Sequence, residues 1–148
     1  MFRTFARATL ALAVPVLALV SSSSASASAV PGFDGKARVN SDANCFIESW
    51  GSALNTCGTD KDINYALPVA SSGTNTATFY TSATAVTTAN ICRTFSVGPT
   101  GGITTGGTVN MQVGSANAIA SSVYVPSWGA MWGVCTVPAN GKILHVHN

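Results

Sequence analysis

Two tryptophans set four positions apart are the side chains best suited to hold a ligand. Trp128 and Trp132 flank the run Gly-Ala-Met, and Tyr124 lies four positions earlier. An exposed aromatic face stacks on sugar rings or apolar ligands, and neighbouring glycines allow close approach. We therefore take Trp128, Trp132 and Tyr124 as candidate ligand-binding residues. For Trp132, packing in the core over a disulfide is the favoured interpretation, and for Trp128 core packing is an equal alternative. Trp50 is expected in the core as well.

The two histidines suggest a different chemistry. His145 and His147 have strand spacing, which points both imidazoles to one face, close enough to share zinc, copper or nickel. Two ligands rarely hold a metal alone, and no third ligand is suggested nearby. We expect both imidazoles to face solvent without a metal.

Oxygen-bearing residues alternate at Asp60, Asp62 and Asn64, as they do where a calcium-binding loop begins. The sixth position of such a loop calls for glycine and is Tyr65 here, while the twelfth calls for glutamate and is Ser71. A polar turn is the favoured interpretation, and a non-standard calcium site is the alternative. We expect neither a metal nor a cofactor.

Residues for acid–base or nucleophilic catalysis are scarce. Glu48 is the only glutamate, both histidines lie close to residue 148, and no Gly-x-Ser-x-Gly elbow occurs. A glycosidase with paired carboxylates would need an aspartate as the partner of Glu48. We expect the protein not to be an enzyme.

The chain has four cysteines and no Cys-x-x-Cys pair, which favours disulfides over a zinc site or a redox centre. Four cysteines allow three pairings, and the sequence does not choose among them. We favour Cys45–Cys57 with Cys92–Cys135, because the first pair would close a hairpin whose turn is Gly51-Ser52.

Residues 1–29 have the composition of a secretory signal peptide. Arg3 and Arg7 precede an apolar run, and a Ser/Ala tract then offers small residues for cleavage after Ala27 or Ala29. The run is shorter than the ~20 residues that a membrane-spanning helix needs. We expect a cleaved signal peptide and a secreted, extracellular bacterial protein without membrane insertion, with the periplasm as the alternative compartment.

Cleavage at Ala29 leaves five basic and five acidic residues, so the net charge of the mature chain is zero. A neutral chain with scattered charges lacks the basic patch that nucleic acids and anionic membranes attract. The expected partners are a polysaccharide, a small apolar ligand or another protein.

The elements that must position these residues are short strands. We expect an irregular lead-in over 30–43 and a single disulfide-linked β domain over 44–148. Apolar and polar residues alternate over 74–83, 91–97 and 108–113, Gly/Pro/Ser/Asn turns separate the runs, and no helical period appears. Gly98–Gly107 is expected to be a loop. The pattern predicts an all-β antiparallel sandwich, Ig-like or jelly-roll-like, of seven or eight strands; a small β-barrel is the alternative.

The spacing Cys45…Trp50…Leu54…Cys57 and the run Trp132-Gly133…Cys135 resemble the neocarzinostatin-type enediyne apoproteins, secreted sandwiches that carry an apolar chromophore. The cysteine spacings are longer here, so the resemblance concerns architecture. We expect a binding module for carbohydrate, cell-wall polymer or an apolar small molecule. The alternatives are a structural or interaction protein of the envelope or matrix, and a protease inhibitor that presents Gly98–Gly107.

Overall fold

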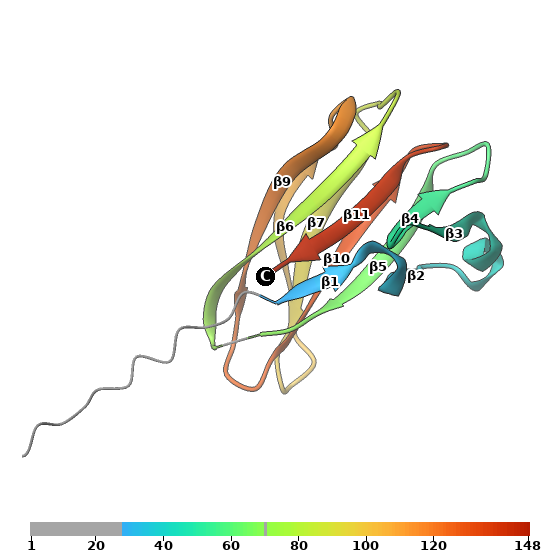
Figure 1. Ribbon diagram of the computed structural model, residues 1–148. Coiled ribbons are helices and arrows are strands. Elements are labelled where there is room, and N and C mark those ends of the chain that lie inside the picture. Colours follow the sequence, from blue (N-terminus) through green and yellow to red (C-terminus); the bar gives the residue numbers. More distant parts are fainter. Residues whose placement is uncertain (1–27, 70) are drawn as a thin grey trace, which may run out of the picture.

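The computed structural model describes residues 28–69 and 71–148, which form two antiparallel sheets (Figure 1). The described chain contains these strands: β1 (Ala29–Pro31), β2 (Lys36–Ala37), β3 (Phe46–Ser49), β4 (Ser52–Asn55), β5 (Lys61–Leu67), β6 (Gly73–Ala83), β7 (Ile91–Val97), β8 (Ile103–Asn110), β9 (Gly114–Val125), β10 (Ala130–Val137) and β11 (Lys142–His147). Two short 3-10 helices, η1 (Gly32–Asp34) and η2 (Asn40–Cys45), lie between the first strands.

The two sheets pack face to face. The first has the strand order β3-β4-β11-β6-β9, with β1 added beside β11, and the second has the order β2-β5-β10-β7-β8. The predicted all-β antiparallel sandwich is confirmed. The described strands outnumber the seven or eight expected. Strands as short as β1 and β2 contain too few residues to show an alternation of apolar and polar side chains in the sequence.

The core lies between the sheets and follows the alternation of side chains along each strand. Ala77, Phe79 and Thr81 of β6 are fully buried, while the residues between them face outwards. Tyr65 of β5 is buried as well, and its hydroxyl donates a hydrogen bond to the Gly32 carbonyl oxygen at 2.7 Å. Burial raises the pKa of Tyr65, with a smaller effect from the charge of Asp34, so its hydroxyl keeps its proton.

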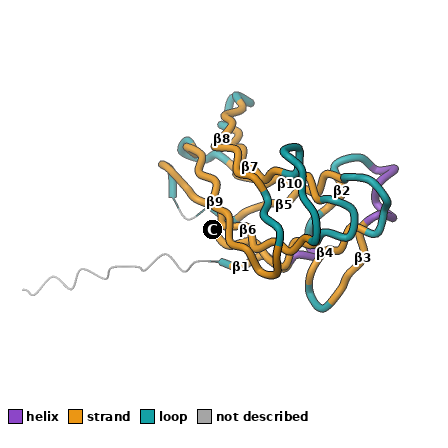
Figure 2. Tube along the Cα trace, turned by 90° about the horizontal axis from the view of Figure 1, so that it is seen from above, coloured by secondary structure: helices purple, strands orange, loops and turns teal. Residues whose placement is uncertain are grey.

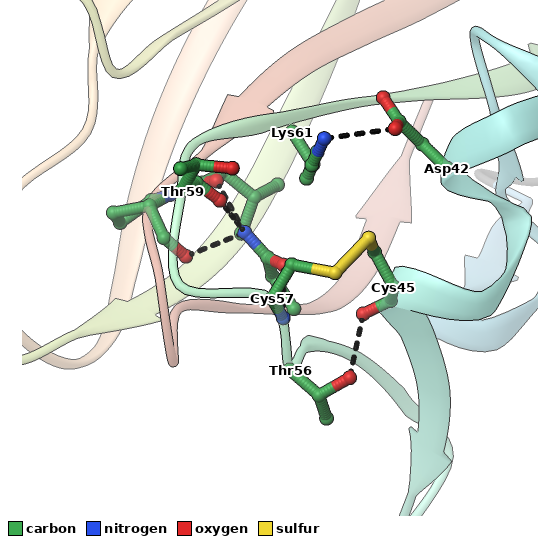
Figure 3. The surroundings of a disulfide bond; sticks show 9 residues. Asp42, Cys45, Thr56, Cys57, Thr59 and Lys61 are labelled. Atoms are coloured by element: carbon green, nitrogen blue, oxygen red, sulfur yellow. Dashed lines mark hydrogen bonds and ion pairs between the residues drawn. A yellow bond between two sulfur atoms is a disulfide. The ribbon is translucent and has the colours of Figure 1, made fainter.

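Two disulfides link the elements in the expected pairing. Cys92 and Cys135 face each other across β7 and β10, and both are fully buried in the core. Cys45–Cys57 closes the β3–β4 hairpin, where the Thr56 hydroxyl also donates to the Cys45 carbonyl oxygen at 3.0 Å (Figure 3). Nearby, Lys61 forms an ion pair of 2.8 Å with Asp42 of η2.

Three sequence expectations need correction. The lead-in over 30–43 is not simply irregular, because β1 pairs with β11 and β2 pairs with β5. Gly98–Gly107 is not one loop, because Ile103 begins β8, which pairs with β7 despite its glycines. The connection between β7 and β8 is confined to 98–102. The third correction is Trp50, which is fully exposed rather than in the core.

The signal peptide predicted over 1–29 lies mostly outside the described residues. Only Ser28 and Ala29 of that range are described. The backbone of Ser28 exchanges hydrogen bonds with Asn148, and Ala29 lies opposite His147.

Candidate ligand-binding site

Trp128 stands at the tip of the turn that joins β9 to β10. The Gly129 amide donates a hydrogen bond to the Pro126 carbonyl oxygen at 2.9 Å, and Trp128 occupies the third position of the turn with a φ of 61°. That position usually holds glycine or asparagine, since a Cβ is strained there. The indole is nevertheless 95% exposed.

Gly129 makes the turn possible. A Cβ at this position would lie 2.8 Å from the Pro126 carbonyl oxygen and 2.9 Å from that of Val97, and neither backbone can move away easily. Gly129 therefore lets the turn lie against the end of β7.

A hollow of ≈ 480 Å³ lies beside the Trp128 turn, open to solvent. The β5–β6 connection contributes Val69, Ser71 and Ser72, and the turn contributes Pro126 and Ser127 together with the tryptophan. The hollow thus combines an aromatic face and two small apolar surfaces with serine hydroxyls. Such a surface suits a ligand that has both CH-rich faces and hydroxyl groups.

Trp132 belongs to a different surface, the outer face of the second sheet. Its ring stacks on that of Phe95, with centroids 5.5 Å apart and an interplanar angle of 14°. The two rings border a pocket of ≈ 200 Å³, whose other lining residues are Arg38, Asn64, Ile103 and Val134. Trp132 is partly buried by this packing, and it does not cover the core disulfide, because Cys135 points inwards.

Tyr124 faces the opposite side of the molecule. It lies on β9 between the buried residues Val123 and Val125, so its exposed ring is on the outer face of the first sheet. The three aromatic candidates therefore occupy three places: an outer face each for Tyr124 and Trp132, and the connecting turn for Trp128. They do not form one site.

Trp50 is a fourth exposed aromatic position, and sequence reasoning missed it. It forms the turn between β3 and β4 with Gly51, and both residues have positive φ, 54° and 76°. The turn projects away from the two sheets (Figure 2). The signal was the Gly51 that follows Trp50 at the centre of the predicted hairpin, since two-residue hairpin turns need positive φ.

His145 and His147 lie on the outer face of the first sheet beside Tyr80. The His145 ring stacks on Tyr80 at 4.2 Å and lies 4.9 Å from the His147 ring, edge to face. Both imidazoles are partly buried rather than fully in solvent. Burial lowers the pKa of His145, and the nearby charge of His147 lowers it further.

Asp60, Asp62 and Asn64 do not converge as calcium ligands would. Asp60 accepts a hydrogen bond from the Asn90 amide at 2.8 Å. Asp62 and Asn64 lie on strand β5, where Asp62 pairs with Arg38 at 3.1 Å and accepts from Thr136 at 2.7 Å. Within residues 28–69 and 71–148, no group of three or more His, Cys, Asp or Glu side chains could hold a metal ion.

No protein-family model matches the chain, and no curated protein matches it. Among solved structures, it is similar to the carbohydrate-binding module CBM6cm-2 from Cellvibrio mixtus lichenase 5A, in complex with cellotriose. The identity is 9%, the alignment covers 81% of this chain and 94% of the module, and the TM-score is 0.48. Neither of the helices in the described part of the chain is long and apolar enough to cross a bilayer.

Proposed function

We propose that the protein is an exported, non-catalytic domain that binds a carbohydrate or cell-wall polymer through the Trp128 turn. One observation carries the proposal: a fully exposed tryptophan is held on strained backbone beside an open hollow. Left-handed backbone costs a residue with a Cβ roughly 1–2 kcal/mol, and Trp128 recovers none of it by burial in the fold. Trp50 has the same exposure and a similar φ, so it is the hollow beside Trp128 that points to a contact outside the chain as the reason to keep an indole there.

The shape of the hollow favours a polymer over an enclosed small apolar molecule. Apolar ligands are held in pockets that bury most of their surface, whereas this hollow is open along the turn. An aromatic face with serine hydroxyls nearby matches the two kinds of surface on a sugar ring. Export supports the same ligand class, because two disulfides suit an oxidising compartment, where wall polymers and secreted polysaccharides occur.

The test is depletion of the oxidised protein, residues 28–148, from solution by microcrystalline cellulose, chitin and isolated bacterial cell walls. Trp128→Asn removes the indole but keeps a residue that tolerates left-handed backbone. Trp50→Asn is the matched control, since Trp50 is as exposed and has the same backbone conformation at another place.

We expect at least one matrix to retain the wild type and the Trp50→Asn variant, and Trp128→Asn to lose that retention by about tenfold or more. Equal retention of all three proteins would contradict the role of Trp128. Retention of none of them on any matrix would contradict the proposed function.

A second candidate function rests on β9. This strand has 12 residues and, among the described strands, forms a ladder only with β6. Gly106 of β8 lies close against the Ser122 backbone, and the rest of the other edge of β9 could bind another strand. An interaction or structural protein would use that edge, and sedimentation velocity would then show concentration-dependent self-association without any polysaccharide. A monomer at all concentrations removes self-association as its role.

A further inference from the structure

We infer that the outer face of the second sheet is a second, charge-selective subsite, and that it binds an acidic sugar polymer of the uronate type. This inference rests on the proposed function, because it names the ligand class of a carbohydrate-binding domain. It concerns the Trp132–Phe95 pocket, not the Trp128 hollow.

The first observation is that positive charge gathers on this face, although the mature chain is neutral. Arg93 projects outwards from β7, Arg38 lines the pocket, and Lys36 lies opposite Asn64 in the ladder. Asp62 is the one acidic side chain on the outward positions of the described strands of this sheet. It is already paired with Arg38 and bonded to Thr136.

Arg93 has no such partner. Its guanidinium carbon lies 5.3 Å from the centre of the Phe95 ring, and none of the described carboxylates is within ion-pair distance of it. Among the described residues, the face therefore offers a guanidinium held beside an aromatic ring and free to pair with an anion. Arginine donates in a fork that fits a carboxylate.

The second observation is an amide oxygen without a hydrogen-bond partner. Asn64 Oδ1 is buried from solvent and accepts no hydrogen bond within the described structure, and Asn64 lines the same pocket as Trp132. Buried acceptors are normally satisfied, and one left unpaired costs about 1–3 kcal/mol. A hydroxyl group of a ligand in the pocket would donate the missing bond once the Asn64 side chain turns its Oδ1 towards the pocket.

These features together favour one kind of ligand, with Arg93 beside the pocket rather than in its lining. The stacked pair Trp132–Phe95 offers an aromatic border for a ring with CH-rich faces, Asn64 calls for a hydroxyl donor, and Arg93 calls for an anion. A pyranose bearing a carboxylate has all three. The pocket, at ≈ 200 Å³, is smaller than the roughly 300–1,000 Å³ of sites for larger small molecules and suits a single ring of a chain.

The experiment measures binding of oxidised wild-type protein to soluble polygalacturonate and to neutral dextran and hydroxyethylcellulose by affinity electrophoresis. The variant is Arg93→Gln, which removes an outward-facing, half-buried charge without disturbing the core. Lys142→Gln is the matched control, because Lys142 is basic but lies on β11 of the other sheet. Trp132→Phe is a second variant that reduces the stacking surface.

We expect wild type to prefer polygalacturonate, and Arg93→Gln to weaken that binding about three- to fivefold at low salt, with less effect in high salt. Trp132→Phe weakens it as well, and Lys142→Gln leaves it unchanged. Equal loss in the Arg93 and Lys142 variants would overturn the inference, because it would show attraction by net charge alone.

Two further results would overturn it. One is neutral-polymer binding that depends on Trp128 with no preference for polygalacturonate, which would leave the proposed function standing. The other is tighter binding of a single-stranded oligonucleotide than of polygalacturonate, which would assign the same aromatic and basic face to nucleic acid. Failure of wild type to bind any of the polysaccharides would contradict both this inference and the proposed function.

Discussion

Trp50 and Trp128 share a backbone conformation that tryptophan seldom adopts. Each lies at the tip of a turn, next to a glycine, with φ near 60° and its indole in solvent. At the scale of single residues, both tryptophans thus have a strained backbone and a side chain that is not buried in the fold. Neither indole packs against the core, so the stability of the domain should not depend on either one.

For Trp128, this predicts that Trp128→Asn leaves the free energy of unfolding unchanged or raises it by up to about 1 kcal/mol. Asparagine tolerates left-handed backbone better than tryptophan does. Urea unfolding followed by far-UV circular dichroism measures the change. A loss of more than about 1 kcal/mol would show that the indole packs against the fold.

A second residue-scale prediction concerns pH. The lowered pKa of His145 means that the unfolded chain takes up a proton at higher pH than the folded chain does. The stability contributed by neutral His145 is thus complete above its ordinary pKa of about 6.5 and falls as pH decreases through that value towards the folded pKa. The rings that contact it among the described residues are those of Tyr80 and His147, neither of which bears a carboxylate.

Thermal unfolding at a series of pH values between about 7.5 and 5 provides the measurement. Wild type should lose stability over the lower part of this range, and His145→Gln should lose less. An identical slope in both proteins would mean that His145 does not titrate differently in the two states.

At the scale of elements, β7 explains why the Trp132–Phe95 surface could not be foreseen. Its alternation was recognised from sequence, yet the polar set, Thr94 and Ser96, faces the core, and Phe95 faces outwards. Cys92 determines this choice, because its buried disulfide places the even-numbered residues inside. The apolar side chains of Ile91, Phe95 and Val97 would by themselves favour the odd-numbered residues inside.

The hydroxyl groups of Thr94 and Ser96, which point into the core from β7, form hydrogen bonds with residues of β9. The Ser121 hydroxyl lies 2.8 Å from that of Thr94, accepts from the Thr94 amide at 3.0 Å and donates to the Gly107 carbonyl oxygen at 2.5 Å. Ser96 donates to the Tyr124 carbonyl oxygen at 2.6 Å. Ser121 therefore connects three strands from both sheets, which is why a polar interior is tolerated here.

We expect Ser121→Ala to cost about 1–3 kcal/mol of unfolding free energy, because it leaves the buried amide and hydroxyl of Thr94 on β7 without this partner. Ser122→Ala is the neighbouring control: Ser122 is exposed and bonds only the Thr76 hydroxyl among the described side chains. Chemical unfolding of both variants measures the two changes in the free energy of unfolding. Equal effects would refute the connecting role of Ser121.

At the scale of the whole molecule, the two disulfides act over different lengths of chain. Cys92–Cys135 spans 43 residues and Cys45–Cys57 spans 12. Loop-closure entropy then assigns roughly 4 kcal/mol to the first and roughly 3 kcal/mol to the second. The long-range bridge also lies in the core, whereas Cys57 is partly exposed.

Replacing both cysteines of a pair by alanine tests this order. The Cys92/Cys135 double variant should lose more stability in urea than the Cys45/Cys57 double variant. The reverse order would show that the hairpin bridge holds the fold, for instance by fixing η2 against β3 and β4.

The sequence was sufficient for the sandwich class, because hydrophobic alternation and turn residues are local signals that survive without knowledge of neighbours. It was insufficient for β8, whose glycines read as a loop, since pairing with β7 outweighed their low strand preference. The sequence also could not predict that the candidate ligand-binding residues lie apart from one another. The tryptophans were visible in the sequence, but the separation of Trp128, Trp132 and Tyr124 depends on which sheet each strand joins.

The most direct test of the central claim is a ¹H–¹⁵N NMR titration that follows the indole N–H signals of Trp50, Trp128 and Trp132. Cello- and chito-oligosaccharides are the soluble probes. The proposed function predicts that the Trp128 indole signal shifts in a saturable manner with at least one of them, while the Trp50 signal stays in place. Movement of the Trp50 signal alone, or of none of the indole signals, would contradict it.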